Sequence, residues 1–394
     1  MSKIQEKDKE YIAGTYARFP VTIVSGKGSV VYDENGKRYI DMGSGIGVTA
    51  FGISDNEWVT AVNDQLARVQ HMSNLYYTKP CGELAELLCQ KTGMKKVFFG
   101  NSGAEANECA IKVARKYAAE KKGAEYTTIV TLKNSFHGRT LTTLSATGQE
   151  HYHELFQPLT PGFAYADANN FEDLKKVVDE NKTAGILIEC IQGEGGVNVL
   201  DADFVKKTAE YAAAKDIVMM VDEVQTGNGR TGELYAYMNY GIHPDVVTTA
   251  KGLGGGLPIG ACLLGEKVQN VLGFGDHGST YGGNPVCCAG AFSIISRIDE
   301  NLLADVKKKS EFIFDSLSGA KGITDVSGMG LMIGIKTEKP AAHIVKACIE
   351  KGVLCLTAKD KVRLLPALNI PMDVLTEAVK IIKDICADDV LPTA

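Results

Sequence analysis

The sequence lacks the features that mark membrane, secreted and nucleic-acid-binding proteins. No apolar run is long enough to span a bilayer, and the first residues lack the apolar core of a signal peptide. The chain has 42 lysines and arginines against 48 aspartates and glutamates, and a formal net charge of -6 argues against nucleic acid as the main partner. We therefore expect a cytoplasmic protein that binds small molecules and neither a membrane nor a nucleic acid.

Several nucleotide, metal and disulfide motifs are also missing. No G-x-x-x-x-G-K-[ST] loop occurs, and no complete G-x-G-x-x-G follows an early strand, although Gly252, Gly254 and Gly256 come close. The ten cysteines have no framework spacing, and the adjacent pair Cys287 and Cys288 matches no zinc or redox pattern. We predict free thiols in a reducing compartment and no metal site. A nucleotide-binding oxidoreductase remains a less supported alternative.

The central part of the sequence alternates between two hydrophobic patterns. Its 394 residues are 45% hydrophobic, enough for two domains or one large domain with an appendage. Short apolar runs occur at residues 96–99, 128–132, 184–188, 217–221 and 245–250. Helical patterns occur at residues 57–69, 82–92, 105–121, 171–180 and 202–215. The alternation predicts an α/β fold with a mainly parallel sheet covered by helices on both faces.

Both ends of the chain have a different pattern. Residues up to about 20 are predicted to form an arm, and residues 29–33 and 38–42 flank an Asn-Gly turn that predicts a hairpin. After about residue 285 we expect a helix over residues 286–297 that continues to 317, a strand at 328–335, a helix at 343–351, a strand at 362–365 and a helix at 374–385. We divide the chain into residues 1–48, a large domain at 49–290 and an α+β segment at 291–394. The first and last parts should form one small domain.

Lys251 stands at the end of the last apolar run, directly before a glycine-rich turn. In open α/β sheets the ligand binds beyond the carboxyl ends of the strands. A lysine that is partly desolvated there has a lowered pKa, and its amine becomes a usable nucleophile. Taken alone, a solvated lysine that ends a strand is the commoner explanation.

Other strand ends carry groups that suit a single ligand. Ser102 begins an S-x-x-E capping box, so a helix N-terminus there can bind phosphate. Phe136 can stack on a planar ring, and Asp222, directly after a buried run, needs a partner such as a protonated ring nitrogen. Each residue also has an ordinary explanation as a cap or loop residue. Pyridoxal phosphate has the phosphate, the ring, the ring nitrogen and an aldehyde for Lys251.

At these residues the sequence resembles the class III aminotransferases of fold type I, over essentially its whole length. The shared motifs, in chain order, are residues 101–107 (Asn-Ser-Gly-Ala-Glu-Ala-Asn), 136–140 (Phe-His-Gly-Arg-Thr), 192–194 (Gln-Gly-Glu), 222–227 (Asp-Glu-Val-Gln-Thr-Gly), 251–252 (Lys-Gly) and 278–285 (Gly-Ser-Thr-Tyr-Gly-Gly-Asn-Pro). Two positions depart from the family: residues 52–57 replace a common G-H-x-H-P motif, and Cys190 stands where proline is usual. The resemblance implies pyridoxal 5'-phosphate as the cofactor.

The resemblance also implies a role for each matching residue. Lys251 is the catalytic lysine that carries the cofactor. The implied cofactor-binding residues are Ser102, Gly103, Ala104, Phe136, Asp222, Glu223, Val224, Gln225, Lys251 and Thr280. The implied substrate-binding residues are Arg139, Ser279, Arg363, Glu194 and Tyr16. Thr280 is expected to reach the cofactor phosphate of the other subunit, with Ser279 at the same interface, so a homodimer is implied.

The resemblance also implies a substrate, through two arginines. Arg139 resembles the arginine that holds the remote carboxylate of an acylated ornithine. Arg363 resembles the arginine that binds 2-oxoglutarate or glutamate, and Glu194 the carboxylate that shields it. Residues 73–78 and 363–366 have close counterparts in members that act on acetylornithine. The implied reaction converts N2-acetyl-L-ornithine and 2-oxoglutarate to N-acetyl-L-glutamate 5-semialdehyde and L-glutamate, in arginine biosynthesis.

Other substrates remain alternatives at this stage. Succinylornithine, 4-aminobutyrate and acetyl-lysine-type donors are not separated by the sequence. Free ornithine is disfavoured, because Ile46 stands where ornithine aminotransferases have a tyrosine. A non-catalytic protein of the same fold is disfavoured by the joint presence of Lys251, Asp222 and both arginines.

Overall fold

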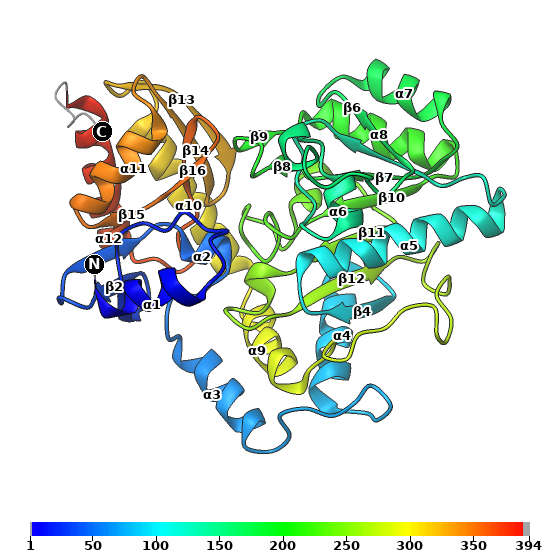
Figure 1. Cartoon of the computed structure of the whole chain (residues 1–394), viewed down its shortest axis with the longest axis horizontal. Helices are drawn as coiled ribbons and strands as arrows, with labels where there is room; N and C mark the ends of the chain where they lie inside the picture. The colour runs from blue at the N-terminus through cyan, green and yellow to red at the C-terminus, as the bar shows by residue number, and fades with distance from the viewer. Residues whose placement is uncertain (1, 389–394) are drawn as a thin grey trace.

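A seven-stranded sheet forms the centre of the larger part of the molecule (Figure 1). The computed structural model describes residues 2–388. The strand order is β4 (Lys96–Gly100), β12 (Gly260–Leu264), β11 (Val246–Thr249), β10 (Val218–Asp222), β7 (Thr183–Ile188), β5 (Thr128–Leu132) and β6 (Phe163–Ala166). β12 is antiparallel to both neighbours, and the other paired strands are parallel. The α/β prediction is confirmed, while β12 and β6 were not predicted.

Helices cover both faces of this sheet, as predicted (Figure 1). Along β10, Val218 and Met220 belong to the same buried cluster as the inner face of α5 (Gly103–Lys121). Met219 and Val221 belong to the opposite cluster, with residues of α7 (Phe171–Glu180) and α8 (Ala202–Ala214). Because side chains alternate along a strand, a continuous apolar run such as β10 must be covered on both sides.

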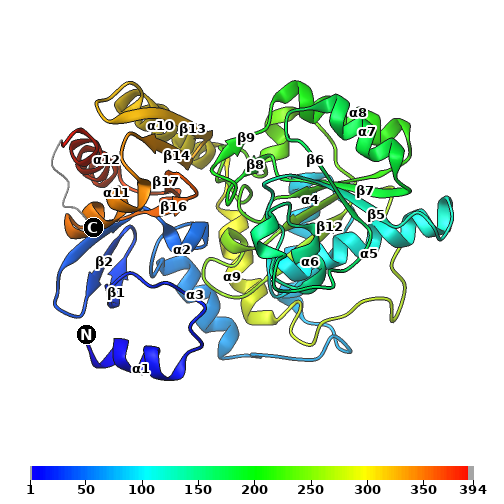
Figure 2. The ribbon, with the colours of Figure 1, turned by 45° about the horizontal axis from the view of Figure 1, so that its top comes forward.

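The smaller part of the molecule joins the two ends of the chain (Figures 1 and 2). One sheet has the order β1 (Ile23–Lys27), β2 (Val30–Asp33), β3 (Arg38–Asp41) and β15 (Val353–Leu354), and β3 pairs with β15 in parallel. A second sheet has the order β13 (Ile323–Met329), β14 (Met332–Thr337), β17 (Lys361–Leu364) and β16 (Leu356–Ala358). Helices α10 (Glu300–Leu317), α11 (Ala341–Glu350) and α12 (Met372–Ala387) belong to the same part. The β3–β15 pairing supports the proposed small domain, whose boundaries remain a prediction.

The remaining elements connect or border these two parts. They are α2 (Ser44–Gly47), α3 (Asn56–Leu66), α4 (Lys79–Thr92), α6 (Leu141–Ala146), η1 (Glu150–Tyr152), β8 (Ile191–Gln192), β9 (Asn198–Val199), η2 (Ala236–Tyr240), η3 (Lys251–Leu253) and α9 (Pro285–Ser296). β9 contacts β13, so the β8–β9 hairpin lies where the two parts meet (Figure 2).

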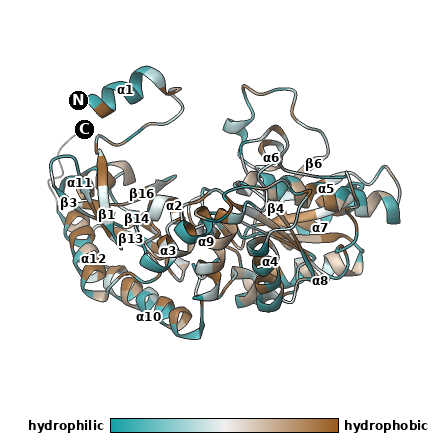
Figure 3. Ribbon diagram, turned by 90° about the horizontal axis from the view of Figure 1, so that it is seen from below, coloured by the Kyte–Doolittle hydropathy of each residue, from teal (hydrophilic) through white to brown (hydrophobic). Residues whose placement is uncertain are grey.

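Three predicted elements are corrected. The N-terminal arm begins with helix α1 (Lys3–Tyr11), which has a capping box at Ser2, has no buried residue and is largely hydrophilic (Figure 3). The long helix after residue 285 is two helices, because Asp299 caps α10 by accepting a hydrogen bond from the backbone of Leu302. The strand predicted at 328–335 is a β13–β14 hairpin that turns at Gly330, where φ is +58°.

Within residues 2–388, no helix is both long and apolar enough to cross a membrane.

Candidate active site

A cavity of about 470 Å³ lies at the carboxyl ends of the parallel strands. It brings together nine of the residues predicted from the sequence: Ser102, Gly103, Ala104, Phe136, Arg139, Asp222, Val224, Gln225 and Lys251. These residues lie at or directly after the carboxyl ends of four different strands, β4, β5, β10 and β11. The sheet therefore positions one site from segments that are far apart in the chain.

Lys251 reaches this cavity from a strained position after β11. Its φ of +44° lies in the left-handed region, which is uncommon for a residue with a side chain. The carbonyl oxygen of Lys251 accepts a hydrogen bond from the backbone nitrogen of Gly254 at 3.1 Å, but its side-chain amine has no hydrogen bond or ion pair with the described residues, although Lys251 lines the cavity. Burial lowers the pKa of its amine, and the carboxylates of Glu194 and Asp222 oppose this shift. A lysine with a lowered pKa and no partner is suited to react with an aldehyde.

Asp222, the last residue of β10, is held by three donors. Its Oδ2 accepts a hydrogen bond from Nδ2 of Asn107 at 2.7 Å and lies 2.9 Å from Nδ1 of His137. Its Oδ1 accepts a hydrogen bond from the backbone nitrogen of Val224 at 3.0 Å. The Oδ1 of Asn107 in turn accepts from the hydroxyl of Thr248 at 2.7 Å. The network fixes a buried carboxylate at the cavity wall, where it can face a positively charged ring nitrogen.

The N-terminus of α5 forms another side of the cavity. Ser102 is the N-cap residue, and its Oγ accepts a hydrogen bond from the backbone nitrogen of Glu105. Gly103 and Ala104 open the helix, so their N–H groups have no intrahelical acceptor. A Cβ on Gly103 would lie 2.6 Å from Cγ1 of Val224, so a side chain does not fit at this position. Such a helix N-terminus can accommodate an anion such as phosphate.

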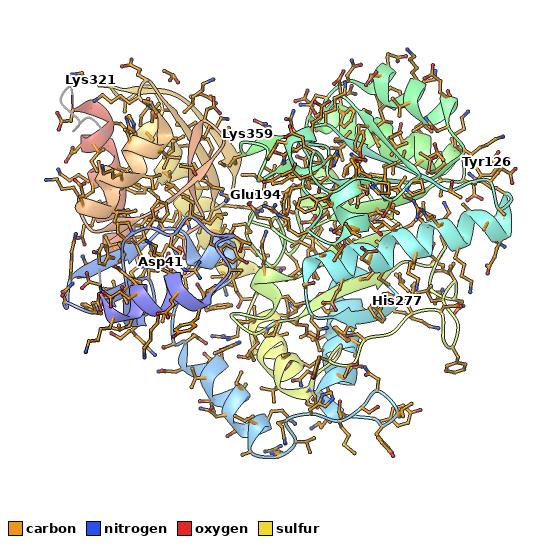
Figure 4. All side chains as sticks on the ribbon, viewed as in Figure 1. Asp41, Tyr126, Glu194, His277, Lys321 and Lys359 are labelled. Carbon is orange, nitrogen blue, oxygen red and sulfur yellow. The ribbon has the colours of Figure 1, made fainter. Side chains whose placement is uncertain are left out.

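Two arginines near the cavity differ in their partners. Nη1 of Arg363, on β17, lies 2.6 Å from Oε1 of Glu194 and 3.1 Å from Oε1 of Gln225. Arg363 and Glu194 do not line the cavity themselves but adjoin it through Gln225, and Glu194 lies at the junction of the two parts (Figure 4). Burial alone would raise the pKa of Glu194. The charge and the hydrogen bond of Arg363 have the larger effect, and the pKa of Glu194 therefore lies below its usual value. Arg139 lines the cavity without an ion pair to any described residue.

Besides Arg363 and Glu194, four predicted residues lie outside the cavity. The carboxylate of Glu223 is buried behind the site, where it accepts hydrogen bonds from the backbone nitrogens of Ala236 and Tyr237 and from the hydroxyl of Thr226. Neighbouring residues at a strand end point to opposite sides, so Glu223 cannot face the cavity with Asp222. Its carboxylate binds the backbone at residues 236–237, and its predicted contact with the cofactor remains a prediction.

The other three are near the surface of the single chain. Ser279 accepts a hydrogen bond from Nδ2 of Asn101 at 3.0 Å. Thr280 and Tyr16 are exposed and do not line the cavity. Their predicted contacts with the cofactor and substrate remain predictions.

Two groups in the cavity wall, Asn107 and Glu189, were given no role from the sequence. Asn107 could have been noticed as a polar residue on the inner face of α5, within a motif already singled out. Glu189 follows β7 and lines the cavity, and its Oε2 accepts a hydrogen bond from the backbone nitrogen of Phe136 at 2.9 Å. Burial, with the nearby charge of Asp222, raises the pKa of Glu189 well above its usual value.

The residues of the cavity fit pyridoxal phosphate. The unpaired amine of Lys251 suits the aldehyde, the open N–H groups of α5 suit the phosphate, and the fixed carboxylate of Asp222 suits the ring nitrogen. Phe136 and Val224 supply apolar surface for a ring. In residues 2–388 no group of three or more His, Cys, Asp or Glu side chains is placed to hold a metal ion.

Known proteins resemble the chain over almost its whole length. The family model described as Aminotransferase class-III matches residues 11–386. The acetylornithine aminotransferase of Haemophilus ducreyi is 45% identical over 388 residues, which cover 98% of this chain and 99% of that protein. The acetylornithine aminotransferase of Methanocaldococcus jannaschii is 45% identical over 367 residues, with 92% of each chain covered.

Solved structures share the fold. The ornithine aminotransferase from Toxoplasma gondii ME49 has a TM-score of 0.93 at 30% identity and covers 97% of this chain and 94% of its own. The N-acetylornithine aminotransferase from Stenotrophomonas maltophilia K279a has a TM-score of 0.84 at 32% identity, covering 97% of this chain and 98% of its own. The fold is therefore that of the fold type I enzymes, as predicted.

Proposed function

The chain belongs to the class III aminotransferases, which depend on pyridoxal phosphate, and on this basis we propose that it transfers the terminal amino group of N2-acetyl-L-ornithine to 2-oxoglutarate. The products are N-acetyl-L-glutamate 5-semialdehyde and L-glutamate, which places the chain in arginine biosynthesis. The observation that carries the proposal is the difference between the two arginines: Arg139 is unpaired at the cavity, and Arg363 is paired with Glu194. The names of the relatives support the same substrate.

The two arginines fit the two amino-group carriers in turn. The acylated ornithine has one carboxylate, remote from the reacting amine, which Arg139 can bind with its planar fork. The 2-oxoglutarate and glutamate molecules have two carboxylates, so they need Arg363 as well. The Glu194–Arg363 ion pair lets the acylated ornithine bind without an unpaired charge beside it. The pair must open when 2-oxoglutarate or glutamate binds, so that Arg363 can bind the second carboxylate.

The chemical step depends on Lys251 and Asp222. When bound, pyridoxal phosphate supplies an aldehyde that accepts the amino group and a protonated ring that withdraws electrons. The amine of Lys251, with its lowered pKa, takes a proton from the carbon that bears the amino group and returns a proton during the exchange. Asp222, fixed by Asn107 and His137, would provide the carboxylate that faces the ring nitrogen of the bound cofactor.

A homodimer with shared active sites belongs to the same proposal. Leu75, Tyr77 and Phe274 are among the most exposed apolar side chains of the described residues. Leu75 lines a surface pocket together with Ser279 and Thr280, and Nδ2 of Asn74 donates a hydrogen bond to the backbone oxygen of Ser279 at 3.1 Å. Exposed apolar surface of this kind is typical of a subunit interface. A cytoplasmic location is supported by the ten cysteines, all of which are free.

A panel of amino donors tests the substrate. The half-reaction of the loaded enzyme is followed by its visible absorption with N2-acetylornithine, N2-succinylornithine, 4-aminobutyrate, an acetylated lysine and free ornithine. We expect the highest kcat/KM for N2-acetylornithine. It should exceed the values for 4-aminobutyrate and free ornithine, which have no acylated α-amino group, by about 10-fold or more. A higher value for 4-aminobutyrate or free ornithine would overturn the proposed substrate, while leaving the aminotransferase assignment in place.

A further inference from the structure

Tyr152 contacts the arginine that the proposed function assigns to the donor carboxylate. Cζ of Arg139 lies 4.2 Å from the centroid of the Tyr152 ring and 5.4 Å from that of Phe136. The two rings meet edge to face, with centroids 5.8 Å apart and planes at 71°. Arg139 makes no hydrogen bond or ion pair with any described residue. The aromatic contacts are therefore what restrains its guanidinium.

Such a contact restrains an arginine without occupying its donors. A guanidinium over an aromatic face is held by the ring quadrupole and by dispersion, and this attraction uses none of its five N–H groups. An exposed arginine without the ring would have many rotamers and would lose that freedom on binding a carboxylate. Tyr152 can lower this cost and leave the planar fork open to the ligand.

The backbone fixes the position of Tyr152 relative to Arg139. The backbone nitrogen of Tyr152 donates to the carbonyl of Gln149 at 3.1 Å. Nε2 of Gln149, a buried side chain, donates to the carbonyl of Ser135 at 3.0 Å. Ser135 directly precedes Phe136 in the loop that carries Arg139. The tyrosine and the arginine are thus held by one connected segment, and the Tyr152 hydroxyl makes no hydrogen bond within residues 2–388.

We propose that Tyr152 is a positioning residue for substrate specificity. Its ring pre-orients Arg139 toward the carboxylate of the amino donor. The proposal rests on the proposed function, because it takes Arg139 as the carboxylate-binding residue. It assigns the effect to the aromatic face and not to the hydroxyl. It concerns binding of the donor and not the proton transfer at Lys251.

A pair of donors isolates this effect. N2-acetylornithine is compared with N-acetyl-1,4-diaminobutane, which is the same molecule without the carboxyl group. In the Tyr152→Ala enzyme, we expect kcat/KM for N2-acetylornithine to fall by about 3- to 10-fold, mainly through KM, and the value for the decarboxylated donor to stay within about 2-fold. The Tyr152→Phe enzyme should keep the wild-type ratio of the two donors. An equal loss for both donors in Tyr152→Ala, or a Tyr152→Phe enzyme as impaired as Tyr152→Ala, would overturn the proposal.

A matched control is available on another surface. Tyr126 also lies under a cation, with Nζ of Lys182 5.1 Å from its ring centroid, and it is remote from the cavity (Figure 4). The Tyr126→Ala enzyme removes the same kind of contact and should leave the donor ratio unchanged. If Tyr126→Ala reduced the ratio of the kcat/KM values for the two donors as much as Tyr152→Ala does, the loss in Tyr152→Ala would reflect general destabilisation, and the proposal would fail.

A double-mutant cycle separates this proposal from the proposed function. The Arg139→Gln enzyme should lose most of the preference for the carboxylated donor, and adding Tyr152→Ala should then have little further effect. A preference that collapses in Arg139→Gln but is insensitive to Tyr152→Ala would overturn the role of Tyr152 alone. A preference that survives Arg139→Gln would overturn the assignment of Arg139, and both proposals with it.

Discussion

Nη1 of Arg363 and Oε1 of Glu194 are 2.6 Å apart, in an ion pair that links the two parts of the molecule. Arg363 lies on β17 of the smaller part, and Glu194 lies in the β8–β9 turn that follows the large sheet. The Arg363 side chain is 4% exposed and that of Glu194 26%. A largely buried arginine needs a negatively charged partner at every stage of the reaction. Arg363 can therefore release Glu194 only when a substrate carboxylate takes its place.

The first prediction removes the charge of Glu194. In the Glu194→Gln enzyme, Arg363 is more available to a second carboxylate, so the enzyme should favour glutamate and 2-oxoglutarate. We expect the ratio of the half-reaction kcat/KM values, glutamate over N2-acetylornithine, to rise by about 10-fold. Glu233→Gln is the control, because Glu233 pairs with Lys307 at 2.7 Å on the surface. An unchanged ratio in Glu194→Gln would contradict the shielding role.

The second prediction concerns the network around Asp222. In the Asp222→Asn enzyme kcat should fall by about 100-fold or more, because the ring nitrogen loses its negative partner. The visible absorption of the bound cofactor should remain, since Lys251 is unchanged. Asn107→Ala removes one donor to Asp222 and should reduce kcat by about 10-fold. Asn181→Ala, at the end of α7, serves as the control. If Asn107→Ala behaved like that control, the network would have no part in catalysis.

The third prediction is a pH dependence of stability. Because burial and Asp222 raise the pKa of Glu189 well above 4.5, the folded chain keeps a proton that the unfolded chain releases. The free energy of unfolding should therefore fall as the pH rises from about 4.5 toward the raised pKa, by up to about 1.4 kcal/mol per pH unit. Glu189→Gln cannot ionise and should lack this loss.

Urea unfolding of the cofactor-free wild-type and Glu189→Gln proteins between pH 5 and 7 measures the difference. The stability of the variant relative to wild type should increase with pH. If the free energies of unfolding of the two proteins changed in parallel between pH 5 and 7, Glu189 would already be ionised in the folded protein, and the prediction would be wrong.

The fourth prediction tests the subunit interface. Sedimentation of the wild-type protein should give twice the mass of one chain. Tyr77→Asp introduces a charge into the exposed apolar surface near Thr280 and should shift the protein toward monomers with weaker cofactor binding. Val24→Asp, on the exposed side of β1, should leave the dimer intact. A Tyr77→Asp protein that stays dimeric would place the interface elsewhere.

The sequence predicted the sheet and most of the cavity for one physical reason. Short runs rich in apolar and β-branched residues, such as β10 and β11, favour buried strands, and parallel strands bring their carboxyl ends to one edge. Lys251 and Asp222 could therefore be placed together before any contact was known. The strand β12 (Gly260–Leu264) was missed because its small and γ-branched residues give no strand signal.

Contacts between loops could not be predicted in the same way. The stacking of Arg139 on Tyr152 joins residues whose relation depends on the 3₁₀ turn η1, and no periodicity indicates it. The burial of Glu223 away from the cavity depends on which side of β10 each residue faces, which a strand buried on both faces does not reveal. Hydrophobic pattern thus locates the site, and side-chain direction decides which neighbours belong to it.

The central claim is that Lys251 holds the cofactor and moves the proton. Borohydride reduction of the loaded wild-type enzyme, followed by peptide mass spectrometry, tests it most directly. The reduced cofactor should be found on the peptide that contains Lys251, and the Lys251→Ala enzyme should show neither that adduct nor turnover. Attachment of the cofactor to another lysine, or turnover retained by Lys251→Ala, would contradict the account.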